Sequence, residues 1–266
     1  MPLNVAVSGA TGRMGREIAR LVGQAEDLRL VGGIARSSYE SRDTIPLGYD
    51  QVEAPETAGP VIEAADVVLD FSSPEQLMRL LKSQAGPLAG RALVVGTTGL
   101  GPAEFEELDR AAERSPVVAA ANFSIGVNVL IALVERAASL LSPELYDVEV
   151  VEAHHRRKLD APSGTALALG SAVARGRQMR LEAVRRDGRS GRAETERPVG
   201  EIGFHAVRGG DVVGEHRVLF LGARERLDLA HVAQDRALFA EGALLAARWA
   251  VRQPPGRYGL LQVLGI

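Results

Sequence analysis

The chain has 266 residues, a formal net charge of −3 and 46% hydrophobic residues, which suits one large or two small globular domains. The near-neutral charge argues against a nucleic-acid or polybasic membrane partner, and the absence of cysteine excludes disulfides, thiol catalysis and thiolate metal sites. No apolar run approaches the ~18 residues of a membrane span and the N-terminus lacks a secretory signal, so we expect a cytoplasmic protein.

In the first half of the chain, short apolar runs alternate with helical patterns. Strands are expected at residues 3–8, 28–35, 66–71, 92–96 and 116–120, and helices at 13–24, 74–84 and 102–114. Such an alternation is typical of βαβ units and a parallel sheet. We therefore predict an α/β fold whose Rossmann-type, parallel-sheet cofactor domain spans residues 1–124.

The second half has a different pattern. It predicts helices at 126–141 and 164–175, strands at 146–153, 202–208, 212–221 and 227–232, and a final helix at 236–251. Gly209-Gly210 is the dipeptide expected in a tight hairpin turn, and the arginine-rich stretch 179–198 is expected to be an exposed loop. We predict an α+β substrate-binding domain over residues 125–234 with an antiparallel or mixed sheet.

A glycine turn joins the first strand to the first helix, with Gly9, Gly12 and Gly15 spaced three apart. At this position glycines let the backbone approach a pyrophosphate at the helix N-terminus, although a purely structural turn would also use them. The second strand ends in Arg36 without the carboxylate that binds an NAD ribose. This favours NADP over NAD, unless Arg36 is simply one exposed arginine among many.

Three further strand ends are small or polar: Asp70–Ser73, Gly96–Gly99 and Ala120–Ser124. In open α/β sheets, ligands bind outside the carboxyl ends of the strands. Gly96 would let the backbone approach a flat ring, and Asn122 could hydrogen-bond a carboxamide. Ordinary turn chemistry is the alternative for each loop, but together the three favour a cleft lined for nicotinamide.

The segment 152–165, EAHHRRKLDAPSGT, gathers more side chains suited to proton transfer or anion binding than any other part of the chain. His154 can exchange a proton near neutral pH, and Lys158 is one of only two lysines in a chain with 29 arginines. The helix that begins at Pro162–Thr165 offers backbone N–H groups to a second anionic group. A basic surface loop is the alternative. A metal site is not expected, because His154 and His155 would lie on opposite faces of a strand, and the remaining three histidines are expected to be structural.

Six motifs together resemble the bacterial 4-hydroxy-tetrahydrodipicolinate (dihydrodipicolinate) reductase family: GATGRMG, DFSSPE, GTTG, AANFSIGVN, EAHHRRKLDAPSGTAL and GFHAVRGGDVVGEH. The resemblance covers essentially the whole chain. It implies hydride transfer to a cyclic dicarboxylate imine in lysine and diaminopimelate biosynthesis, with NADPH preferred and NADH as a second possible cofactor.

By matched position, the resemblance also implies the site residues. His154 would be the proton donor and Lys158 the second catalytic donor, while His155, Gly164 and Thr165 would bind the substrate carboxylates. The cofactor would be bound by Gly9, Ala10, Thr11, Gly12, Arg13 and Met14 at the pyrophosphate, Arg36 at the 2′-phosphate, and Gly96, Thr97, Thr98, Ala120, Ala121, Asn122 and Phe123 around the nicotinamide half.

The family further implies that residues 235–266 pack back on the cofactor domain and that the second sheet forms a homotetramer interface. Two departures from the family pattern are Ala35-Arg36, where many members carry Glu-Arg, and Thr11, where glycine is common. Two alternatives remain open: another two-domain NADP-dependent dehydrogenase of amino or keto acids, such as aspartate dehydrogenase, and a dinucleotide sensor without turnover.

Overall fold

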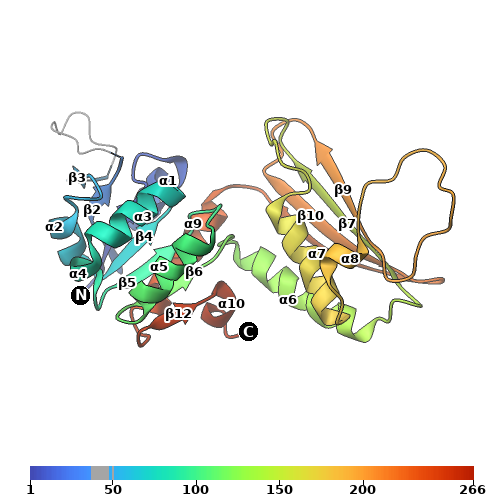
Figure 1. Ribbon diagram of the computed structural model, residues 1–266. Coiled ribbons are helices and arrows are strands. Elements are labelled where there is room, and N and C mark those ends of the chain that lie inside the picture. The colour runs from blue at the N-terminus through green and yellow to red at the C-terminus, as the bar shows by residue number, and fades with distance from the viewer. Residues whose placement is uncertain (37–47, 50) are drawn as a thin grey trace. The chain divides into compact units, whose positions relative to one another are not determined.

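The computed structural model describes residues 1–36, 48–49 and 51–266. Two compact units are formed, one by Met1–Ile125 with Ala237–Ile266 and the other by Gly126–Arg236 (Figure 1). We call them unit 1 and unit 2. Each unit has its own sheet and its own hydrophobic core.

Unit 1 contains a seven-stranded sheet in the order β12-β6-β5-β4-β1-β2-β3, in which every pair of neighbours is parallel. Parallel strands need crossover connections, and helices supply them here. The strands are β1 (Leu3–Ser8), β2 (Leu28–Ile34), β3 (Val52–Glu53), β4 (Val67–Asp70), β5 (Ala92–Val95), β6 (Pro116–Ala119) and β12 (Gly256–Tyr258). The parallel α/β fold predicted for the first half of the chain is confirmed.

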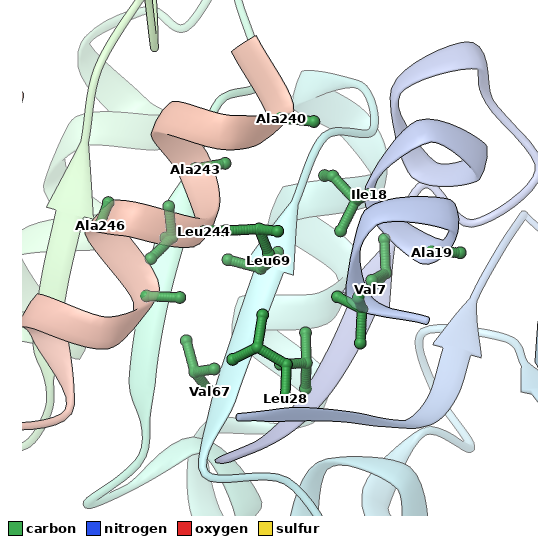
Figure 2. Close-up of a cluster of buried hydrophobic side chains, with 14 of the residues drawn as sticks. Val7, Ile18, Ala19, Leu28, Val67, Leu69, Ala240, Ala243, Leu244 and Ala246 are labelled. Atoms are coloured by element: carbon green, nitrogen blue, oxygen red, sulfur yellow. The ribbon is translucent and has the colours of Figure 1, made fainter. Parts of the chain in front are cut away.

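Helices cover both faces of this sheet, which explains why its central strands are continuous apolar runs. The helices of unit 1 are α1 (Arg13–Val22), α2 (Gly59–Glu63), α3 (Pro74–Ser83), α4 (Ala85–Leu88), α5 (Pro102–Ala112), α9 (Ala237–Ala250) and α10 (Leu260–Val263). Alternate residues of a strand enter different cores: Leu69 packs with α1 and α9, whereas Val68 packs with α2, α3 and α5. Figure 2 shows Leu69 between Ile18 of α1 and Leu244 of α9.

Unit 2 contains a mixed five-stranded sheet in the order β11-β10-β7-β9-β8. Strand β7 is central: it pairs with β9 in parallel and with β10 in antiparallel orientation. The strands are β7 (Asp147–His154), β8 (Arg185–Asp187), β9 (Ile202–Arg208), β10 (Gly214–Leu221) and β11 (Arg226–Ala233), and the helices are α6 (Ile125–Leu140), α7 (Gly164–Gly176) and α8 (Leu181–Val184). One face of the sheet packs against α6 and α7.

Two predictions for unit 2 were wrong. Gly209-Gly210 does not close a hairpin between β9 and β10, because β7 lies between those two strands. Instead, Gly209 donates its N–H to the His154 carbonyl and Gly210 accepts from the Arg156 N–H, so the turn passes over the end of β7. The stretch 179–198 is not entirely loop, since it contains α8 and the edge strand β8, which pairs with β9.

No helix of the described residues has both the length and the apolar character that crossing a membrane requires.

The packing of α9 in unit 1 yields a test. Gly242 of α9 lies so close to the Phe123 carbonyl oxygen that a Cβ would collide with it. Gly242→Ala must displace the helix from backbone atoms that cannot yield, so we expect unfolding to become easier by about 1–3 kcal/mol. Calorimetry measures the change. The control is Gly86→Ala in α4, where a Cβ would meet no atom within 4 Å and stability should hold or rise by about 0.4–1 kcal/mol. Equal behaviour of the two variants would contradict the packing argument.

Candidate functional site

The glycine turn after β1 is anchored to the end of the neighbouring strand. The N–H groups of Gly9 and Ala10 both donate to the Ile34 carbonyl, at 2.9 and 3.1 Å. Gly9 has φ +83°, a conformation that favours glycine, and a Cβ at this position would collide with the Phe71 backbone. These contacts fix the conformation of the turn, and residues 9–14 lead without interruption from the end of β1 into the first turn of α1.

The N-terminus of α1 is suited to an anion. Its N-cap residue is Gly12, which has no side chain to accept from the first-turn N–H groups, and the first turn contains no acidic residue. These N–H groups have no partner within the helix and lie at the positive end of its dipole. Gly12 and Arg13 are exposed. A dinucleotide pyrophosphate therefore fits this turn in both charge and access.

Arg36 follows β2, the strand paired with β1 in parallel register. It is exposed, and the preceding Ala35 is buried, so neither position supplies a carboxylate to a ribose. Residues 37 and 38, which continue this strand end in the sequence, lie outside the described residues. An exposed guanidinium beside the glycine turn is compatible with a 2′-phosphate.

A buried carboxyl group joins three strand ends of unit 1. Asp70, at the end of β4, is fully buried and accepts from the hydroxyls of Thr97 at 2.5 Å and Ser72 at 2.9 Å. Burial raises the pKa of Asp70 above its ordinary value, and hydrogen bonds from Ser8, Thr97 and Ser72 counteract that rise only in part. The sequence places Asp70 at the end of a predicted strand, but the order of residues along the chain does not show that Ser8 and Thr97 hydrogen-bond its carboxyl group.

The two loops predicted to surround nicotinamide follow adjacent strands. Val95 pairs with Ala119, so Gly96–Thr98 and Ala120–Phe123 begin at the same edge of the sheet. Between them, the Phe71 ring contacts Gly96 and lies 5.5 Å from the Phe123 ring, centroid to centroid. The individual side chains of the loops differ in environment: Thr97 and Phe123 are buried, Thr98 and Ala121 are exposed, Ala120 and Asn122 are half-buried, and the Asn122 Oδ1 accepts from the Ser124 N–H.

In unit 2, β7 ends in a buried histidine–carboxylate pair. Glu152 and His154 are two residues apart on a strand, so they share a face. The His154 Nδ1 lies 2.5 Å from the Glu152 Oε2. Burial lowers the pKa of His154, and the neighbouring Glu152 carboxylate offsets this in part.

Glu152 is also the partner of Arg208 in β9 and of the α7 N-cap. The two Arg208 Nη atoms donate to the two carboxylate oxygens at 2.6 and 2.7 Å, and the Ser163 N–H donates to Oε1 at 3.1 Å. Burial opposes the charge of Glu152, but the hydrogen bonds from Arg208, His154 and Ser163 lower its pKa overall. The sequence analysis missed Glu152 and Arg208. The two-residue spacing from His154 was the available signal for Glu152, whereas only the pairing of β7 with β9 identifies Arg208.

A second buried histidine lies beside the pair. The His216 ring of β10 makes an edge contact with His154, at 5.1 Å between centroids and 73° between planes. The His216 Nε2 lies 3.1 Å from the Ser163 Oγ, which accepts from the Ala166 N–H as the cap of α7. Burial lowers the pKa of His216 to about 4. The expected structural role of this histidine agrees with these contacts, but its place next to His154 could not be foreseen.

The remaining predicted residues of unit 2 surround this pair. The Lys158 Nζ is 2.9 Å from the Asp160 Oδ1, and the charge of Lys158 also contributes to lowering the pKa of His154. Gly164 and Thr165 are the first two residues of α7, directly after Ser163, and the first turn of α7 has no acidic residue. His155 is half-buried, and its Nδ1 has no hydrogen-bond partner among the described residues. Across the described part of the chain, no group of three or more His, Asp or Glu side chains could hold a metal ion.

Both halves of the chain match family models. The N-terminal model of dihydrodipicolinate reductase matches residues 3–123, and the C-terminal model matches residues 126–264. The 4-hydroxy-tetrahydrodipicolinate reductase of Cereibacter sphaeroides is 45% identical over 267 residues and covers 98% of each chain. That of Caulobacter vibrioides is 42% identical over 264 residues, covering 99% of this chain and 98% of the relative.

A solved structure agrees. The dipicolinate-bound dihydrodipicolinate reductase from Paenisporosarcina sp. TG-14 matches with a TM-score of 0.69 and 26% identity, over 98% of this chain and 99% of that chain. Sequence and fold therefore give the same assignment over the full length, and the chain belongs to the dihydrodipicolinate reductase family.

Proposed function

We propose that this chain reduces 4-hydroxy-tetrahydrodipicolinate (dihydrodipicolinate) to tetrahydrodipicolinate with a nicotinamide cofactor. The observation that carries the proposal is the buried Glu152–His154 pair, joined through Ser163 to the N-terminus of α7. This arrangement places a group that exchanges protons close to a helix end that attracts a carboxylate. Family membership supports the diacid substrate and favours it over the amino- and keto-acid dehydrogenase alternative.

Unit 1 would hold the dinucleotide. Gly9, Ala10, Thr11, Gly12, Arg13 and Met14 would bind the pyrophosphate, supported by the uncapped and acid-free start of α1. The nicotinamide half would lie along Gly96, Thr97, Thr98, Ala120, Ala121, Asn122 and Phe123. Thr97 would contribute its backbone, because its hydroxyl already donates to Asp70. Arg36 would bind a 2′-phosphate, which makes NADPH the preferred cofactor and NADH the weaker one.

The bound nicotinamide supplies a hydride. Its addition to the conjugated imine leaves an enamine-type anion, which must take up one proton. His154 would donate that proton from Nε2, since Nδ1 is engaged by Glu152. The pKa of His154 is low in the free site, and two substrate carboxylates would raise it and so favour the protonated ring. Lys158 would act as the second donor, while His155, Gly164 and Thr165 would bind the carboxylates.

We also infer a homotetramer built on the sheet of unit 2. The face opposite α7 carries half-buried Val151 and Leu219 and exposed Val207 and Val232. Apolar residues at such a density on a sheet face are typical of an association surface. A cytoplasmic location is an inference from the biosynthetic family.

The proton donor can be tested by His154→Gln. Glutamine keeps a hydrogen-bonding group but cannot deliver a proton, so kcat should fall by about 10²–10⁴-fold. Wild-type kcat should fall as pH rises through the pKa of His154 in the substrate complex, and the variant should lose this limb of the profile. NADPH binding, followed by fluorescence, should be unchanged. A variant with wild-type kcat would remove His154 from the mechanism.

The lysine can be tested with a matched pair. Lys158→Arg keeps the charge, but a planar guanidinium cannot take the place of a compact ammonium, so kcat/KM should fall by about 10²-fold or more. The control is Lys82→Arg, which changes the other lysine, an exposed residue in the last turn of α3. Its kinetics should match the wild type. Near-normal activity of Lys158→Arg would mean that any cation serves at this position.

Cofactor choice can be tested by assaying the coupled synthase–reductase reaction with NADPH and NADH side by side. Arg36→Ala should raise KM for NADPH by about 10–100-fold, the worth of lost charge-assisted hydrogen bonds, and leave KM for NADH nearly unchanged. Arg29→Ala serves as control, because Arg29 is exposed near the opposite end of β2. Equal effects on both cofactors would contradict the 2′-phosphate assignment, and absence of diacid reduction with either cofactor would overturn the proposed function.

A further inference from the structure

Four residues of unit 2 form a closed ring of contacts. Glu152 hydrogen-bonds His154, the His154 ring contacts His216, His216 hydrogen-bonds Ser163, and the Ser163 N–H returns to Glu152. The members come from β7, β10 and the cap of α7. Because these four contacts form a closed loop, the orientation of the His154 imidazole and the position of the α7 N-terminus depend on one another.

The position of the proton between Glu152 and His154 follows from the other partners of Glu152. The Ser163 Oγ accepts from the Ala166 N–H and lies 3.1 Å from the His216 Nε2. Glu152 accepts two hydrogen bonds from the Arg208 guanidinium and is only 1% exposed. Such a paired carboxylate is an acceptor only, and therefore the His154 Nδ1 must carry the proton that lies between them.

The other ring nitrogen of His154 is thereby assigned. Its Nε2 lies against Gly214, at 3.1 Å from where a Cβ of that residue would be, so any side chain at position 214 would crowd this nitrogen. In the neutral ring Nε2 has a lone pair, and it gains a proton when the ring is charged. Glu152 thus determines which nitrogen exchanges a proton.

The charges around His154 come from four elements. Glu152 on β7 is the acid, Arg208 on β9 and Lys158 in the loop after β7 are cations, and His216 on β10 is held neutral by burial. His231 on β11 is the register neighbour of His216 on the adjacent strand. Asp160 is engaged by Lys158. Among the described residues, Glu152 is therefore the one anion in hydrogen-bond contact with the imidazole.

We propose that Glu152 is a positioning residue. It holds His154 as the Nδ1–H tautomer and so keeps Nε2 available for proton delivery, and it connects the His154 imidazole to the N-terminus of α7. The part of this role that concerns proton delivery during turnover rests on the proposed function. Glu152 is buried beneath His154 and need not touch substrate. The role extends to Arg208, which keeps Glu152 charged and also donates to the Asp160 carbonyl in the Lys158 loop.

The first experiment is ¹⁵N NMR of histidine-labelled protein, which needs no turnover. In the wild type we expect neutral His154 to be protonated at Nδ1, and the Nε2 signal to show the large change on titration. In Glu152→Gln the charge is lost and an amide that can also donate takes its place, so the pKa of His154 should fall by about one unit or more and the preference for Nδ1–H should weaken. A wild-type signal showing the Nε2–H tautomer would overturn the proposal.

The second experiment is the pH dependence of kcat. In Glu152→Gln, kcat should fall by about 10–10³-fold, with its basic limb moved to lower pH and a smaller change in KM. Glu152→Asp restores the carboxylate and should recover part of the shift. A fall in kcat with an unmoved pH limb and unchanged ¹⁵N signals would show a merely structural role and overturn the proposal.

Glu149→Gln is the matched control. Glu149 is a buried glutamate on the same strand, three residues earlier and on the opposite face, where it pairs with Arg197 and His205. It should leave the His154 signals and the pH limb unchanged. If Glu152→Gln fails to fold because Arg208 is left unpaired, the double variant Glu152→Gln/Arg208→Gln removes that charge, and the same predictions apply to it.

The outcomes separate this proposal from the proposed function. If the wild type does not reduce the diacid, the proposed function fails, while the tautomer and pKa of His154 still decide the role of Glu152. If the wild type is active but Glu152→Gln leaves tautomer and pH limb unchanged, only the present proposal fails.

Discussion

The ion pair between the buried Glu152 and the half-buried Arg208 is the interaction on which the candidate site of unit 2 depends. It joins the neighbouring strands β7 and β9 and supplies an acceptor to His154 and to the N-cap of α7. A buried pair of this kind contributes little net stability, because desolvation offsets much of the attraction, but removal of one partner leaves an uncompensated charge. Its value here lies in geometry: the same carboxylate holds the His154 imidazole and the N-terminus of α7.

Unit 1 contains a second buried carboxyl group that behaves in the opposite way. Within the part of the chain that the structure describes, Asp70 is hydrogen-bonded to hydroxyl and backbone groups, and burial raises its pKa. Glu152 has a guanidinium partner, and its pKa is lowered. The difference follows from the partners, since a hydroxyl stabilises a buried charge less than a cation does. Each carboxyl group connects the loops of its own unit: Asp70 joins the ends of β1, β4 and β5, and Glu152 joins β7, β9 and α7.

The strong excess of arginine over lysine also has a structural aspect. Several arginines are bidentate partners of carboxylates, as in Arg248 with Asp27, Arg79 with Glu56 and Arg208 with Glu152. Lys158 is different: it is a compact ammonium in the loop that follows His154, its side chain is 23% exposed, and it pairs with the Asp160 carboxylate. An ammonium can direct its three N–H donors to partners in several directions, whereas a guanidinium donates in a single plane.

Local patterns in the sequence predict the longer helices and strands and the residues proposed for the site. Apolar periodicity predicts five of the seven strands of unit 1 within one or two residues, because both faces of a parallel sheet are buried and the pattern is local, but it does not reveal the short strands β3 and β12. The motif around His154 and Lys158 was likewise visible, since its residues are adjacent in the chain. Only the tertiary structure decided what lies between distant segments: that β7 separates β9 from β10, that Arg208 meets Glu152, that His216 contacts His154, and that Ser8 and Thr97 surround Asp70. Strand order and long-range hydrogen bonds depend on how whole elements pack, and no spacing within one segment encodes them.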